Sequence, residues 1–157
     1  MGERQVDKNQ WKERRQFKRV NISFTVMYEI NSPLAVGMVL EGERKAAIAF
    51  DISEAGMGVL INYDLPISTI VTLKFAIVDL AASRIEDQYR SMELEGEVRY
   101  SLYVKEKYAY RVGIRFINIS NKERKFIAKF VKAVSLKNDS QAKKTSAVKQ
   151  GPALLRL

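Results

Sequence analysis

Apolar and polar residues alternate along most of the chain between residues 20 and 119. In VNISFTVMYEI, residues 20–30, every second position is apolar: Val20, Ile22, Phe24, Val26, Tyr28 and Ile30. A period of two puts these side chains on one face of a β-strand and the intervening polar side chains on the other. The pattern predicts further strands in residues 46–52, 58–63, 69–78, 92–104 and 108–119. About six antiparallel strands are therefore expected, and the alternation within 92–104 places Tyr100 on the core face.

A single helix is predicted after the last strand. Ser120 and Glu123 have the spacing of a capping box. They precede an apolar stripe at helical period, formed by Phe126, Ile127, Phe130, Val131 and Val134. After Leu136 the chain is rich in Lys, Ser, Gln and Ala, and residues 137–157 are expected to be a disordered basic tail. The predicted fold is mainly β, a six-stranded antiparallel barrel with a C-terminal α-helix and flexible basic arms.

Composition narrows the range of functions. The chain has 157 residues, of which 46% are hydrophobic, which is enough for the core of one domain. It has no cysteine and no histidine, so a disulfide framework and a thiolate metal site are excluded and the commonest general base is missing. Hydrophobic stretches are too short to span a membrane, and nothing near Met1 resembles a secretory signal. We expect a soluble, cytoplasmic binding protein without enzymatic activity, metal or cofactor.

The net charge of +9 is concentrated at the two ends of the chain. Residues 1–19 hold seven Lys/Arg against three Asp/Glu, and residues 137–157 hold five against one, a balance of +4 in each arm. Residues 20–136 hold fifteen against fourteen, a balance of +1. A duplex-binding domain more usually carries its basic stripe on the folded face. Nucleic acid is therefore not the expected partner.

A basic cluster, RRQFKR at residues 14–19, precedes the first predicted strand. Arg14, Arg15 and Arg19 have planar guanidinium groups, whose forked donors match phosphate oxygens and whose faces can stack on bases. The cluster is consistent with an arm that closes over an anion. A solvated basic leader is the alternative explanation.

The second candidate site is DISEAGMG, residues 51–58. Asp51 ends a strand, and the hydroxyl of Ser53 can either hold a turn or meet a ligand. Gly56 and Gly58 allow positive φ and a close approach of the backbone to an anion or a base edge. A guanine donates from both N1 and N2, which suits the paired oxygens of Asp51. A tight turn between two strands, held by Asp and Ser, is the structural alternative.

Together the two stretches resemble the PilZ domain, a bacterial receptor module for cyclic di-GMP. That family pairs R-x-x-x-R in an arm before the barrel with [D/N]-x-S-x-x-G on the barrel. RQFKR at 15–19 and DISEAG at 51–56 supply every specified position, and YRVGIRFINIS at 110–120 is similar to the family's last strand. The resemblance covers residues 12–134 and implies a six-stranded barrel with a C-terminal helix. The alternation pattern predicts the same fold independently.

The resemblance implies a role for each residue of the two motifs. Arg15 and Arg19 are expected to contact phosphates and guanine faces. Asp51 and Ser53 are expected to bind a guanine edge, and Gly56 to give the ligand room. No residue of this set is expected to be catalytic.

Three further residues belong to the expected binding site. Arg14 matches family members with an extra arginine before the motif, which bind an intercalated pair of ligands, so two cyclic di-GMP per chain are implied. Gly58 lies beside the barrel motif. Tyr100 is the nearest candidate for the aromatic residue that the family often has on a later strand.

The expected function is that of a cyclic di-GMP receptor or adaptor. Ligand would close the basic arm onto the barrel and change a surface for an unidentified protein partner. A PilZ-like module that binds only protein and a barrel that binds single-stranded nucleic acid remain alternatives. The expected boundaries are a leader at 1–11, a PilZ domain at 12–136 (arm 12–19, barrel 20–119, helix 120–136) and a tail at 137–157.

Overall fold

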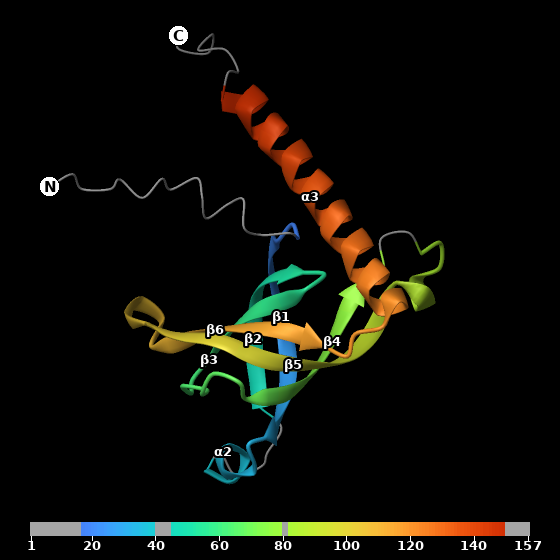
Figure 1. Ribbon diagram of the computed structural model, residues 1–157. Coiled ribbons are helices and arrows are strands. Elements are labelled where there is room, and N and C mark those ends of the chain that lie inside the picture. The colour runs from blue at the N-terminus through green and yellow to red at the C-terminus, as the bar shows by residue number, and fades with distance from the viewer. Residues whose placement is uncertain (1–16, 40–44, 80–81, 150–157) are drawn as a thin grey trace, which may run out of the picture.

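The computed structural model describes residues 17–39, 45–79 and 82–149, with the backbone alone for residues 39 and 144–149. Six strands form one antiparallel sheet that closes in a ring in the order β1-β2-β3-β6-β5-β4 (Figure 1). The strands are β1 (Val20–Ser32), β2 (Lys45–Ser53), β3 (Gly56–Ile61), β4 (Ile70–Val78), β5 (Tyr89–Val104) and β6 (Ala109–Ile117). The predicted mainly-β fold is confirmed, and each strand lies within a few residues of the stretch that predicted it.

The core fills the inside of the ring. Every strand contributes apolar side chains at alternate positions, and the most deeply buried include Val26, Ile52, Val59, Val71, Val98 and Val112. Polar residues between them point to the outer face, as the period of two requires. The outer face therefore holds the charged and polar groups that are free to meet a ligand.

A bulge in β5 changes which of its side chains face the core and which face outward. Up to Val98 the apolar positions are buried as predicted. The register shifts between Val98 and Tyr100, so that Tyr100 pairs with Gly113 and Leu102 is 60% exposed. The expectation that Tyr100 faces the core is wrong, because one extra residue in a strand turns the following side chains to the other face. The ring of Tyr100 instead covers Gly113 on the outer face.

The closing helix, α3 (Asn121–Lys149), is longer than predicted. Its start is the predicted capping box, in which the Glu123 N–H donates to Ser120 Oγ at 3.1 Å. Its buried residues Ile127 and Val131 join the core, while its C-terminal half projects beyond the strands (Figure 1). The prediction that order ends at Leu136 is wrong for residues 137–149, because this stretch contains no glycine or proline to stop a helix. Residues 150–157 of the predicted tail lie outside the described part of the chain.

Short helical segments occupy three of the connections. α2 (Leu34–Val39) follows β1, η1 (Ile85–Asp87) precedes β5, and η2 (Lys105–Lys107) joins β5 to β6. Within the described residues, no helix is long and apolar enough to cross a membrane.

Candidate functional site

The turn between β2 and β3 carries the motif at residues 51–56. Ser53 is 1% exposed, and its hydroxyl accepts a hydrogen bond from the Ala55 N–H at 3.2 Å. The same hydroxyl donates to the Gly56 carbonyl at 3.5 Å. In this structure Ser53 therefore holds the turn, which fixes the end of β2 and the Asp51 side chain beside it.

Asp51 is the centre of the polar contacts at this site. Its Oδ1 accepts hydrogen bonds from the Gly58 N–H at 2.8 Å and from Arg19 Nη1 at 3.1 Å. The side chain of Asp51 is 9% exposed and that of Arg19 is 29% exposed, so the carboxylate is largely shielded from water while the guanidinium group is partly accessible to it. The structure thus brings together the second arginine of the arm motif and the first residue of the barrel motif, which lie 32 positions apart.

The rest of the arm is described only in part. Arg14 and Arg15 lie outside the described residues. Phe17 and Lys18 are described, and Arg124 of α3 lies over the Phe17 ring at 6.0 Å from its centroid. The two described residues before Arg19 therefore lie towards α3, whereas Arg19 itself contacts the barrel.

Gly56 and Gly58 lie where neighbouring atoms approach the backbone closely, and the predicted positive φ is wrong. Neither has a positive φ, and both are strand residues of β3. A Cβ on Gly58 would lie 2.3 Å from the Phe50 ring and 2.8 Å from Asp51 Oδ1. A Cβ on Gly56 would lie 2.2 Å from the carbonyl oxygen of Ile114. These glycines are required because there is no room for a side chain.

A row of four paired residues crosses the outer face beside the motif. Asp51 pairs with Gly58, Gly58 with Gly113 and Gly113 with Tyr100 across β2, β3, β6 and β5. The Phe50 ring occupies the space over Gly58, and the Tyr100 ring occupies the space over Gly113. Tyr100 therefore lies on the same face as Asp51, at the other end of a row whose two central residues have no side chain.

Arg111 was not predicted, although it contacts this site. Its Nη2 lies 3.8 Å from Asp51 Oδ2, and its guanidinium carbon lies 4.3 Å from the centroid of the Phe50 ring. In the sequence Arg111 is one of two outward arginines on β6 and resembles Arg115, which contacts Glu97 instead at 3.5 Å. The alternation places Arg111 on the outer face, but only the order of strands in the ring reveals that it reaches Asp51.

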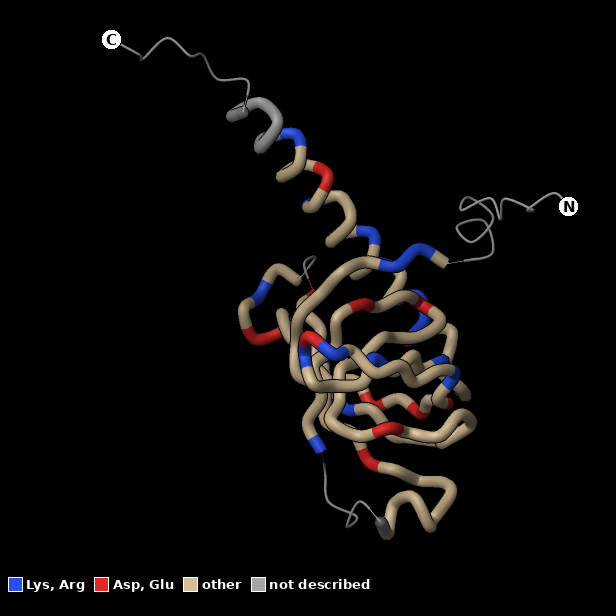
Figure 2. The backbone as a smooth tube through the Cα atoms, turned by 90° about the vertical axis from the view of Figure 1, so that its left-hand side faces the viewer, with Lys and Arg blue, Asp and Glu red and all other residues tan. Residues whose placement is uncertain are grey.

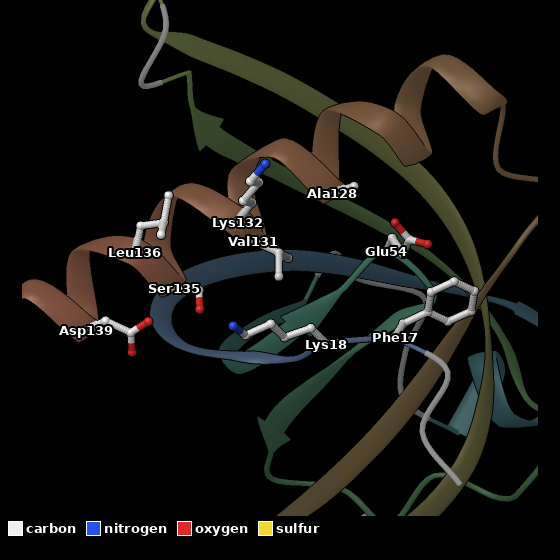
Figure 3. Close-up of a pocket in the computed structure, with 9 residues that line it drawn as sticks. All are labelled: Phe17, Lys18, Glu54, Ala128, Val131, Lys132, Ser135, Leu136 and Asp139. Carbon is white, nitrogen blue, oxygen red and sulfur yellow. The ribbon is translucent and has the colours of Figure 1, made fainter. Parts of the chain in front are cut away.

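A pocket of about 460 Å³ lies next to the motif, between the arm and α3 (Figure 3). It is lined by Phe17, Lys18, Glu54, Ala128, Val131, Lys132, Ser135, Leu136 and Asp139. Figure 2 shows the basic residues at the start of the described chain beside α3, and both Lys18 and the α3 residue Lys132 line the pocket. The segment that supplies Arg19 and the turn that holds Asp51 therefore both border this pocket. Among the described residues there is no group of His, Cys, Asp or Glu that could hold a metal ion.

The family model described as "PilZ domain" matches residues 13–133 of the chain. No curated protein matches this chain. Several solved structures are similar to this chain in fold. The Bacillus subtilis inhibitor of motility MotI/DgrA has TM-score 0.62 and 14% identity, and the match covers 79% of this chain and 52% of that one. The PilZ domain of Escherichia coli YcgR with c-di-GMP has TM-score 0.55 and 12% identity, covering 83% and 98%. The K. pneumonia MrkH–c-di-GMP complex has TM-score 0.58 and 14% identity, covering 82% and 55%. The chain thus spans about half the length of MotI and MrkH and almost all of the YcgR domain.

Proposed function

The chain belongs to the PilZ domain family, and we propose on this premise that it is a receptor for cyclic di-GMP. The observation that carries the proposal is the contact of Arg19 with Asp51, which joins the two motifs at one place on the outer face. The similar structures of YcgR and MrkH are c-di-GMP complexes. Their fold and the position of both motifs in this chain support the same class of ligand here.

The proposed contacts follow from the chemistry of the two motifs. Arg15 and Arg19 bind the phosphates, because guanidinium groups make paired, charge-assisted hydrogen bonds with phosphate oxygens. Asp51 accepts from N1 and N2 of a guanine, since its Oδ1 is held by the Gly58 N–H while Oδ2 is not in a hydrogen bond within the described residues. Ser53 fixes the turn that presents this edge. Gly56 lets the backbone of the turn lie close to β6.

We further propose that ligand binding acts on the pocket beside α3. Arg19 is bound to Asp51, and two residues earlier Phe17 lies against α3. In this proposal Arg19 moves from the Asp51 carboxylate to a ligand phosphate together with its backbone, and the adjoining residues Lys18 and Phe17 shift with it. Their movement changes the lining of the pocket, which is where a protein partner would detect the ligand.

The first expected result is selective binding of cyclic di-GMP. Chemical-shift changes in the amides of β2 and β3 should saturate with cyclic di-GMP, whereas GMP and GTP should bind far more weakly, because one guanine leaves half of the site unused. Cyclic di-AMP is a matched control, since it has the same charge and ring but lacks the paired donors for Asp51. Equal responses to GTP would indicate a generic phosphate site and contradict the proposal.

The second expected result concerns the number of ligands. Arg14 is proposed to be the additional cation that allows two stacked ligands, because three arginines can offset much of the four negative charges of a ligand pair. Wild-type protein should take up two cyclic di-GMP per chain, and Arg14→Leu should take up one while still binding through Arg15, Arg19 and Asp51. Lys12→Leu is a suitable control for the loss of one positive charge from the arm. A wild-type stoichiometry of one per chain would show that Arg14 does not have this role.

A further inference from the structure

Arg111 reaches from β6 across β3 to the motif on β2. Its guanidinium carbon stacks 4.3 Å from the centroid of the Phe50 ring, and its Nη2 lies 3.8 Å from Asp51 Oδ2. Phe50 is placed there by an irregularity of β2, whose register with β3 shifts between Ala49 and Asp51. Because Gly58 has no side chain, the Phe50 ring can lie over β3 where Arg111 meets it. Residues of β2, β3 and β6 thus together fix the position of the Arg111 guanidinium group.

This arrangement is distinct from an ordinary surface ion pair. Arg115 is four residues further along the same strand and face, and it contacts Glu97, as does Arg99. Those contacts are exposed ion pairs, one of which, Arg99 to Glu97, is also a hydrogen bond at 2.9 Å, and no aromatic ring is recorded against either arginine among the described residues. Arg111 also has its guanidinium carbon over the Phe50 ring, while its side chain is 48% exposed. The exposed part of the guanidinium group, called here the open face, is therefore accessible to a planar ligand group.

The open face has the properties of a base-stacking surface. A guanidinium plane supported from below by an aromatic ring is rigid and weakly hydrated, and nucleobases stack on such planes. The Asp51 carboxylate lies beside it, at the edge of the stack. A base lying on Arg111 would meet Asp51 with its edge, and guanine is the base that offers paired donors there.

We propose that the Phe50–Arg111 stack is the platform on which one guanine of the ligand lies, with Asp51 receiving the edge of that base. The proposal rests on the proposed function, because it assigns the seat of one base of cyclic di-GMP. It adds two residues, Phe50 and Arg111, to the binding site, and neither belongs to the arm motif or the turn motif. It also gives Arg111 a role that depends on its planar shape and not only on its charge.

The test measures cyclic di-GMP affinity by calorimetry for wild-type protein and three substitutions of β6 residues. Arg111→Ala should lower the affinity by roughly tenfold or more, the size of one lost stacking contact. Arg111→Lys should lower it by a similar factor, because lysine keeps the charge but has no flat face. Arg115→Ala, a matched control, should remain within about threefold of wild type, since exposed charges contribute little.

Two substitutions of Phe50 test the platform from its other side. Phe50→Leu should weaken binding in the same way as Arg111→Ala, and Phe50→Tyr should retain it, because a tyrosine keeps the ring. Circular dichroism and melting temperature check that each variant is folded, and the half-exposed Arg111 is not part of the core that holds the fold.

The outcomes separate the platform from the proposed function. If wild type binds, Arg19→Ala binds about a hundredfold more weakly, and both Arg111 variants bind like wild type, the platform is wrong and the receptor function stands. If Arg111→Lys binds like wild type but Arg111→Ala does not, charge alone is responsible and the stacking role is overturned. If wild type does not bind at all, both proposals fail together.

Discussion

Arg19→Ala is expected to lower cyclic di-GMP affinity by about a hundredfold, corresponding to the loss of a shielded, charge-assisted contact. The fold should remain, because Arg19 precedes the first core residue, Val20, and its side chain is 29% exposed. Calorimetric titration gives the affinity, and thermal unfolding shows whether stability is kept. Removal of the Arg19–Asp51 contact alone should change the free energy of unfolding by about 1 kcal/mol or less.

Lys18→Ala is the matched control for this prediction. It removes the same charge from the neighbouring residue, which lines the pocket beside α3 and not the ligand site. If binding depends on the position of the arginine, Lys18→Ala should bind within about threefold of wild type. Equal affinity of wild type and Arg19→Ala would contradict a role for Arg19 in ligand binding.

Gly56→Ala is expected to have the largest effect on stability. A Cβ at this position would lie 2.2 Å from the Ile114 carbonyl oxygen and 3.2 Å from the Arg115 Cα, both backbone atoms of β6. Backbone cannot rotate away as the end of a side chain can, so β3 and β6 must separate. The free energy of unfolding should fall by about 3 kcal/mol, as for an overpacked core position.

Gly37→Ala provides the comparison for Gly56→Ala. Its Cβ would approach the Ile30 carbonyl oxygen at 3.4 Å, and Gly37 lies in the helix α2. Alanine favours a helix over glycine by about 1 kcal/mol, so this substitution should be neutral or slightly stabilising. Urea unfolding of both variants measures the difference. A midpoint for Gly56→Ala equal to that of wild type would refute the steric explanation.

The sequence predicted the strands because each strand has one face in the core. Alternation in 20–30 and in 69–78 is a direct consequence of burial on one side, and β1 and β4 follow it. The bulge in β5 was not predictable, since Arg99 carries no signal that it interrupts the ladder. The alternation therefore placed Tyr100 on the core face, although the resemblance made it a site candidate, and the structure has it on the outer face with Asp51.

The candidate site was predictable only where a motif specifies it. Asp51, Ser53 and Arg19 were identified by resemblance to the family's two motifs, and the structure brings Arg19 and Asp51 together. Arg111 and Phe50 have no such signal, because their contact depends on β2, β3 and β6 being neighbours in the ring. The length of α3 was underestimated for another reason: a polar sequence was interpreted as disordered, although nothing in it breaks a helix.

The central claim, that this chain is a cyclic di-GMP receptor, is tested most directly by calorimetric titration of the wild-type protein with cyclic di-GMP. One experiment gives both the affinity and the number of ligands per chain. We expect saturable binding of two ligands per chain at the one site that Arg19 of the arm and Asp51 of the barrel form together. The absence of heat up to high micromolar ligand, from a protein whose melting curve shows it to be folded, would contradict the claim.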